Sequence, residues 1–190
     1  MTIARRRCLV AGASMALAPL ASRAAAARPG DAVDWPMTRL LDGSTWSAAS
    51  WHGMPAVVVF WATWCAPCRR EIPLLQQRQR DHGAEGFQVI GIAVDFRDKV
   101  LAYADEMKIE YPLLIGEQEA LDAAAALGVE AVGFPFTVFS DRQGRIVTAH
   151  MGELTAAQAS LILDAVRQVE SGATTPEAAR AGLEAALAAL

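Results

Sequence analysis

Residues 57–73 read VVVFWATWCAPCRREIP, a pattern that carries two of the three cysteines in the chain. The stretch begins with an uninterrupted apolar, β-branched run, which is typical of a strand covered on both faces. Beyond Cys65 the residues take helical spacing, with Cys68, Ile72 and Leu75 on one face. The sequence therefore predicts a strand that delivers two thiols, three positions apart, to the first turn of a helix.

The two cysteines differ in chemistry because they differ in position. Cys65 lies where backbone N–H groups have no partner within the helix and where the peptide dipoles sum to a partial positive charge. This site favours a thiolate, so we expect an exposed Cys65 whose pKa falls from about 8.5 into the range of roughly 3.5–7.5. Cys68 is one turn deeper and should stay protonated longer. Cys65 is the predicted nucleophile, and Cys68 resolves the mixed disulfide.

Two neighbours of the cysteines add to this site. Pro67 stiffens the loop between the thiols and needs no N–H donor in the first helical turn. Glu71 lies one turn beyond Cys68 on an otherwise apolar face, where a carboxylate is costly without a partner or a task. We interpret Glu71 as a group with a raised pKa that accepts or relays the proton of Cys68. The alternative is a surface glutamate that pairs with a nearby arginine.

The motif FWATWCAPCRREIP, residues 60–73, resembles the active-site signature of the exported TlpA/ResA/DsbE-type disulfide reductases. The resemblance extends from about Val33 to Val169. In that family a glutamate three residues after the second cysteine tunes the thiols, and Glu71 matches it. Cytoplasmic thioredoxins usually carry a buried aspartate in the preceding strand, where this chain has Val59. This difference favours the TlpA-like branch.

The resemblance implies an α/β, thioredoxin-like fold over residues 28–170, with a central mixed sheet flanked by helices. The strand-like pieces around Val33–Leu40 and Thr45–Trp46 predict an N-terminal hairpin that wraps the edge of this sheet. A further helix and strand before residue 135 resemble the central insertion of the family. Residues 171–190 predict a loop and a last helix that docks on the domain, contacts a partner or frays.

The sequence GFPFTVF contains the second predicted functional stretch. In the thioredoxin fold a cis proline begins the strand that faces the cysteine turn, and by resemblance Pro135 takes that place, with a cis Phe134–Pro135 bond. This arrangement leaves the Phe134 backbone free to pair with an extended substrate. The alternative is a trans proline that starts a strand. Phe134 and Pro135 are predicted to bind substrate together with Trp64, Ala66 and Pro67.

Residues 1–27 have the features of an export signal. Arg5–Arg7 precede the apolar stretch Cys8–Ala21, and small residues then offer a cleavage site. The arginines resemble a twin-arginine signal, with Cys8 where an aromatic residue is usual, so the twin-arginine and general secretion routes both stay open. If residues 1–27 are cleaved after export, the remaining chain is expected in the periplasm. An uncleaved membrane anchor is the alternative, although the apolar run is short of the roughly 20 residues that a span needs.

Composition limits the classes of partner. Removal of residues 1–27 takes away four arginines and no acidic residue, so the net charge changes from −4 to −8. An acidic chain without a basic cluster argues against nucleic acid as a partner. The two cysteines that remain are too few for a scaffold of disulfides, and their spacing indicates redox chemistry. No cofactor and no metal are predicted.

These features predict thiol–disulfide exchange, with reduction of periplasmic protein disulfides as the preferred direction. The resemblance implies a membrane thiol–disulfide protein as electron donor, and apocytochromes, oxidase copper sites or other oxidoreductases as substrates. A disulfide oxidase or isomerase is the first alternative, and it would differ in reduction potential, by about 30 mV per 1.4 kcal/mol. A peroxiredoxin-type peroxidase would need a pocket lined by Pro and Thr. A Cu(I)- or Zn-binding module would need ligands besides Cys65 and Cys68.

Overall fold

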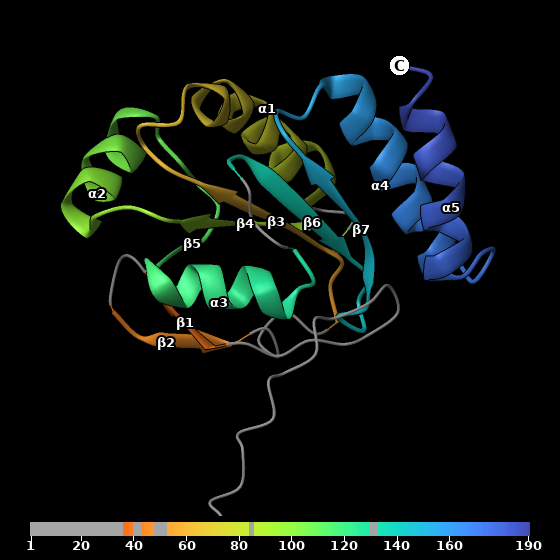
Figure 1. Cartoon of the computed structure of the whole chain (residues 1–190), viewed down its shortest axis with the longest axis horizontal. Helices are drawn as coiled ribbons and strands as arrows, with labels where there is room; N and C mark the ends of the chain where they lie inside the picture. The colour runs from red at the N-terminus through yellow and green to blue at the C-terminus, as the bar shows by residue number, and fades with distance from the viewer. Residues whose placement is uncertain (1–35, 40–42, 48–52, 84–85, 130–132) are drawn as a thin grey trace, which may run out of the picture.

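The fold is given by a computed structural model, and Figure 1 shows how its elements are arranged. The residues that it describes are 36–39, 43–47, 53–83, 86–129 and 133–190. The predicted export segment, residues 1–27, lies outside these ranges. Within them, the helices are all too short or too polar to cross a membrane.

A seven-stranded mixed sheet forms the centre of the domain (Figure 1). Its strands are β1 (Pro36–Arg39), β2 (Thr45–Ser47), β3 (Ala56–Trp61), β4 (Gln88–Ala93), β5 (Leu113–Ile115), β6 (Phe136–Ser140) and β7 (Ile146–Met151). They are ordered β2–β1–β5–β4–β3–β6–β7, with β3, β4 and β5 parallel and the other neighbours antiparallel. This is the mixed sheet that the resemblance implied.

Helices cover both faces of the sheet (Figure 1). They are α1 (Ala66–His82), α2 (Arg97–Glu106), α3 (Gln118–Ala126), α4 (Ala156–Glu170) and α5 (Pro176–Leu187). Side chains of α1, α2 and α4 pack in one core, whereas α3 packs in a second core on the opposite face. Helix α1 therefore lies on the face of the sheet that carries the larger core.

Strand β3 is buried on both faces because each of its faces supplies one core. Val57, Val59 and Trp61 point into the core beneath α1. Val58 and Phe60 point into the core beneath α3. A continuous apolar run is what such a doubly covered strand requires. The predicted buried central strand is confirmed.

The predicted N-terminal hairpin is also present. Strands β1 and β2 pair antiparallel, and β1 pairs with β5, so the hairpin extends one edge of the sheet. Gly43, between β1 and β2, has a φ of +70°, a conformation in which glycine is free of side-chain strain. Strand β5 and helix α3 follow α2 in the chain and correspond to the predicted insertion.

The last helix docks on the domain, which is one of the three possibilities left open by the sequence. Thr175 caps α5 by accepting a hydrogen bond from the Ala178 N–H at 3.3 Å, and Pro176 occupies its first turn. Ala179 and Leu183 then enter the larger core against α4. Helix α5 is therefore part of the folded unit.

Leu183→Ala is expected to lower the free energy of unfolding by about 2–3 kcal/mol, since burial of this side chain is nearly complete, with 3% exposed. Leu190→Ala is the matched control, because Leu190 is 69% exposed and its truncation should change little. Urea denaturation of both variants measures the difference. Equal effects of the two substitutions would mean that α5 does not contribute to the core.

Candidate active site

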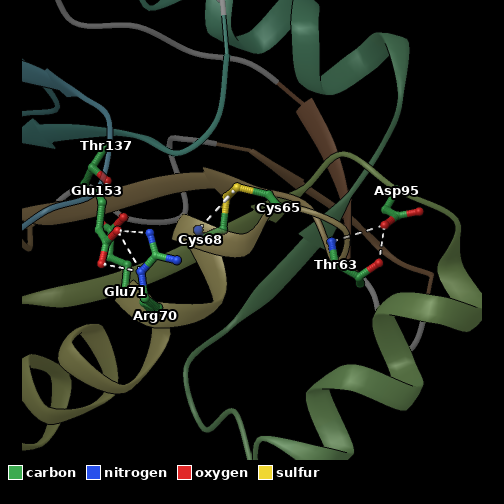
Figure 2. The surroundings of a disulfide bond; sticks show 8 residues. All are labelled: Thr63, Cys65, Cys68, Arg70, Glu71, Asp95, Thr137 and Glu153. Atoms are coloured by element: carbon green, nitrogen blue, oxygen red, sulfur yellow. Dashed lines mark hydrogen bonds and ion pairs between the residues drawn. A yellow bond between two sulfur atoms is a disulfide. The ribbon is translucent and has the colours of Figure 1, made fainter.

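The two cysteines lie at the junction between β3 and α1. The turn between these elements is closed by a hydrogen bond from the Cys65 N–H to the Ala62 carbonyl oxygen at 3.2 Å. Cys65 is the N-cap residue of α1, and its Sγ accepts a hydrogen bond from the Cys68 N–H at 3.2 Å. The two sulfurs form a disulfide with a Cα–Cα distance of 5.3 Å (Figure 2). Cys65 thus lies at the electropositive N-terminus of α1, as the sequence predicted.

The exposure of Cys65 differs from the expectation. Cys65 is 5% exposed and Cys68 is 1% exposed, so Cys65 is the more accessible cysteine by a small margin. The reason is that the Cys65 side chain turns back to bond with Cys68, and both pack with the larger core. The neighbouring Trp64 is instead the exposed side chain of this turn, at 67%.

The segment that contains Pro135 lies beside this turn. The Phe134–Pro135 bond is cis, as the resemblance implied. The ring of Phe134 packs edge-on against Trp64 at a centroid distance of 5.9 Å, which joins the two predicted substrate-binding segments. The Pro135 carbonyl accepts a hydrogen bond from the Gly152 N–H at 2.9 Å. The other two predicted substrate-binding residues, Ala66 and Pro67, lie at the start of α1.

Glu71 is buried beneath α1, with 1% of the residue exposed. Its Oε1 accepts a hydrogen bond from the Thr137 hydroxyl at 3.2 Å, and Thr137 lies directly opposite Val59 in the β3–β6 register. Oε2 has no hydrogen-bond partner among the described residues. The carboxyl group is therefore buried with one of its two oxygens hydrogen-bonded to Thr137.

Burial raises the pKa of Glu71 to about 7. The Leu154 backbone N–H and the Thr137 hydroxyl oppose this rise, whereas the negative charge of Glu153 adds to it. A carboxyl group with this pKa can exchange a proton near neutral pH, as a general acid or base must. The surface alternative for Glu71 is wrong, because the side chain does not reach solvent.

The arginine next to Glu71 pairs with a different carboxylate. Arg70 Nε lies 3.1 Å and 3.0 Å from the two carboxylate oxygens of Glu153, and a terminal guanidinium nitrogen lies 2.5 Å from one of them (Figure 2). This exposed pair joins α1 to the loop between β7 and α4, whose Leu154 N–H faces Glu71. Glu153 is 83 residues from Arg70, and no local pattern in the sequence indicates this pair.

Thr137 is a second residue of this site that the sequence analysis missed. It is fully buried, at 0% exposure, within the apolar strand β6. A hydroxyl in a buried strand needs a hydrogen-bond partner, so its position in the run FTVFS was a usable signal. The buried hydroxyl indicates a polar partner on the same face of the sheet, but it does not identify that partner as Glu71.

The fold and this site together define a thiol–disulfide oxidoreductase with a thioredoxin-like fold. A disulfide at a helix N-terminus, next to a buried carboxyl group, is suited to exchange with other disulfides. Among the described residues, no group of three or more His, Cys, Asp or Glu side chains is placed to hold a metal ion.

Comparison with known proteins identifies the family. A model of the AhpC/TSA family matches residues 30–170, and the chain belongs to this family. Thioredoxin-like protein YneN of Bacillus subtilis (strain 168) is 28% identical over 130 residues, which cover 66% of this chain and 73% of that protein. Thiol-disulfide oxidoreductase ResA of Halalkalibacterium halodurans is 23% identical over 128 residues, which cover 67% of this chain and 70% of that protein.

A solved structure of a thiol:disulfide interchange protein is also similar to this chain. A thiol:disulfide interchange protein of the thioredoxin family from Chlorobium tepidum TLS is 33% identical, with a TM-score of 0.60. The match covers 69% of this chain and 91% of that chain. These relatives confirm the likeness to the TlpA/ResA/DsbE group, and the chain is an enzyme that catalyses thiol–disulfide exchange.

Proposed function

We propose that this enzyme reduces protein disulfides in the periplasm through Cys65 and Cys68. The observation that carries the proposal is the Cys65–Cys68 disulfide at the N-terminus of α1, with the buried carboxyl of Glu71 one turn further along. The helix start stabilises a thiolate on Cys65, and the buried site delays ionisation of Cys68. The two thiols of the reduced enzyme therefore act in a fixed order.

The first step is attack by the Cys65 thiolate on one sulfur of a substrate disulfide. A bond forms between Cys65 Sγ and that sulfur, the substrate S–S bond breaks, and the second substrate sulfur leaves as a thiolate that takes a proton from solvent. The product is a mixed disulfide. The substrate backbone lies along the segment that contains Phe134 and Pro135, and the exposed ring of Trp64 contacts it.

The second step releases the reduced substrate. The Cys68 thiol gives its proton to the Glu71 carboxylate, and the resulting thiolate attacks Cys65 Sγ. The Cys65–Cys68 bond forms, the bond to the substrate breaks, and the substrate leaves as a thiolate. Two electrons have then passed from the enzyme dithiol to the substrate disulfide. A thiol–disulfide protein of the membrane restores the dithiol by the same exchange in reverse.

The location and the substrate class rest on the sequence. Residues 1–27 support export to the periplasm, with a membrane-anchored form as the alternative if they stay attached. Substrates are exported proteins with accessible disulfides, including the apocytochromes that the resemblance implies. The acidic charge of the chain without its export segment makes nucleic acid an unsuitable partner.

Reduction of a model protein disulfide tests the proposal. The reduced full chain is expected to accelerate the reduction of insulin by dithiothreitol, and Cys65→Ser should reduce the rate to the uncatalysed level. Cys8→Ser is the matched control, because Cys8 lies in the export segment and should be dispensable. A Cys65→Ser variant with undiminished activity would contradict the proposal.

Three further measurements separate the alternatives. Equilibration with glutathione measures the reduction potential of the Cys65–Cys68 disulfide. A reductase should have a potential nearer to about −270 mV than to the value of about −120 mV of a strong oxidant. Turnover of hydrogen peroxide faster than that of insulin would favour a peroxidase. Stoichiometric copper or zinc in the purified, reduced protein would favour a metal-binding module.

A further inference from the structure

A buried aspartate ties the cysteine turn to the neighbouring strand. Asp95 follows β4 and is 7% exposed. Its Oδ2 accepts hydrogen bonds from the Thr63 N–H at 3.1 Å and from the Thr63 hydroxyl at 2.5 Å (Figure 2). Its Oδ1 accepts a hydrogen bond from the Phe96 N–H at 2.8 Å. One carboxylate thus binds Thr63, two residues before Cys65, and Phe96, the N-cap residue of α2.

This contact continues the pairing of β3 with β4 beyond the end of the sheet. The parallel register ends at Trp61 and Ala93, and the Val94 N–H donates to the Trp61 carbonyl oxygen at 2.8 Å. The chain after β3 then turns toward α1, and the Asp95 side chain takes over the role of a strand partner by binding Thr63. The turn that carries Cys65 is therefore held from outside as well as by its own hydrogen bond.

The Asp95 side chain is suited to this task because it remains a carboxylate. Burial alone would raise the pKa of Asp95, but the hydrogen bonds from Thr63 and Phe96 and the positive charge of Lys99 together lower it. An ionised carboxylate is acceptor-only, and its three contacts here are all with donors. Hydrogen bonds to a charged acceptor are stronger than those between neutral groups.

Reduction of the disulfide removes one of the contacts that hold Cys65 Sγ. In the oxidised enzyme the covalent bond to Cys68 fixes Cys65 Sγ at the start of α1. In the reduced enzyme that bond is absent, and the sulfur is held by the hydrogen bond from the Cys68 N–H and by the backbone of the turn. The helix dipole stabilises a charge only within the first turn, so displacement of Sγ would remove the stabilisation of the thiolate.

We propose that Asp95 is a positioning residue for the nucleophile, which acts through Thr63 to keep Cys65 Sγ at the N-terminus of α1 when the enzyme is reduced. This inference rests on the proposed function in one respect, namely that the Cys65 thiolate is the reacting group. Asp95 does not touch the substrate or the sulfurs in this role. It sets the reactivity of Cys65 by holding the backbone that carries it.

The test is the pH profile of Cys65 alkylation by iodoacetamide. The full chain with Cys8→Ser and Cys68→Ser leaves Cys65 as its one thiol, so the profile reports a single group. Thr63→Val keeps the size of the side chain and the Asp95 charge but removes the hydroxyl donor. It is expected to raise the pKa of Cys65 by about half to one unit. Thr63→Ser retains the hydroxyl and should keep the original profile.

Asp95→Asn is the second variant and gives a test of sign. Loss of a negative charge by itself would lower the pKa of a nearby thiol, whereas loss of the support for the turn should raise it. A pKa of Cys65 that rises in both Thr63→Val and Asp95→Asn supports the proposal. A pKa that is unchanged or lower in either variant, with the fold retained by circular dichroism, overturns it.

The experiment does not depend on any protein substrate. Insulin reduction with an unchanged alkylation profile in Thr63→Val would leave the proposed function standing and refute the role of Asp95. A shifted profile in these variants, together with no insulin reduction by the chain that keeps Thr63, Cys65 and Cys68, would establish the role of Asp95 and refute the proposed function. The two proposals can therefore fail separately.

Discussion

Cys68→Ser is expected to leave the enzyme covalently joined to its substrates. In this variant Cys65 still attacks a substrate disulfide, but no second thiol is present to break the resulting bond. The local structure should survive, because serine is similar in size to cysteine and the Cys68 backbone N–H that donates to Cys65 Sγ is retained. The effect is close to all-or-none, since the wild-type mixed disulfide is short-lived and the trapped one is stable until a reductant is added.

Non-reducing electrophoresis of periplasmic extracts measures the adducts. The Cys68→Ser protein should form several bands of higher mass that collapse to one band with dithiothreitol. The matched control is the double variant Cys65→Ser, Cys68→Ser, which should form none. Adducts of equal amount with Cys65→Ser alone would mean that Cys68 is the attacking thiol, which would reverse the assigned order.

Glu71→Gln is expected to slow the release of substrate by about 100-fold or more, which is the usual contribution of a positioned general base. In the wild type the rate of this step should rise with pH through about 7, because Glu71 must be ionised to accept the Cys68 proton. The glutamine variant should lose this rise. Stopped-flow measurement of mixed-disulfide decay gives the rate of substrate release and its dependence on pH. A range from pH 5.5 to 8.5 extends about 1.5 units on either side of the Glu71 pKa.

The same substitution is expected to make the protein more stable at pH 8. The pKa of Glu71 is about 7 in the folded protein, above its ordinary value of 4.5, so the folded state binds the proton more tightly. Stability due to this group is present below pH 4.5, falls as the pH rises to about 7, and stays lost above it. The difference corresponds to about 3 kcal/mol. Glu71→Gln removes this penalty.

Urea denaturation at pH 8 and at pH 4 checks the stability effect. The variant should exceed the wild type at pH 8 by a margin of up to about 3 kcal/mol, and the margin should vanish at pH 4. The comparison of the two pH values within each protein serves as the control for changes in packing. A margin that is the same at both values would show that Glu71 titrates normally, and the proposed proton transfer would then lack its basis.

Local signals predicted most of the fold. The apolar run of β3 and the cysteines at the start of α1 each depend on residues close together in the chain, and both are present. The cis bond before Pro135 was also correct, although the family resemblance and not the local sequence predicted it.

The contacts that complete the site depend on register, which the sequence does not reveal. Thr137 reaches Glu71 from 66 residues away because β6 lies beside β3. Asp95 reaches Thr63 across 32 residues because β4 lies on the other side of β3. A buried polar residue at the end or in the middle of an apolar strand indicates that a partner exists. Only the order of the strands identifies that partner.

The two cores that share β3 have a consequence for how the enzyme tolerates change. A shift of this strand by one residue would exchange its two apolar faces and move the cysteine turn with them. The redox pair thus follows directly after a strand whose register both cores fix. The β1–β2 hairpin and helix α5 instead lie at the periphery of the sheet (Figure 1). New docking specificities can therefore arise at the margins of this scaffold while its chemistry stays the same.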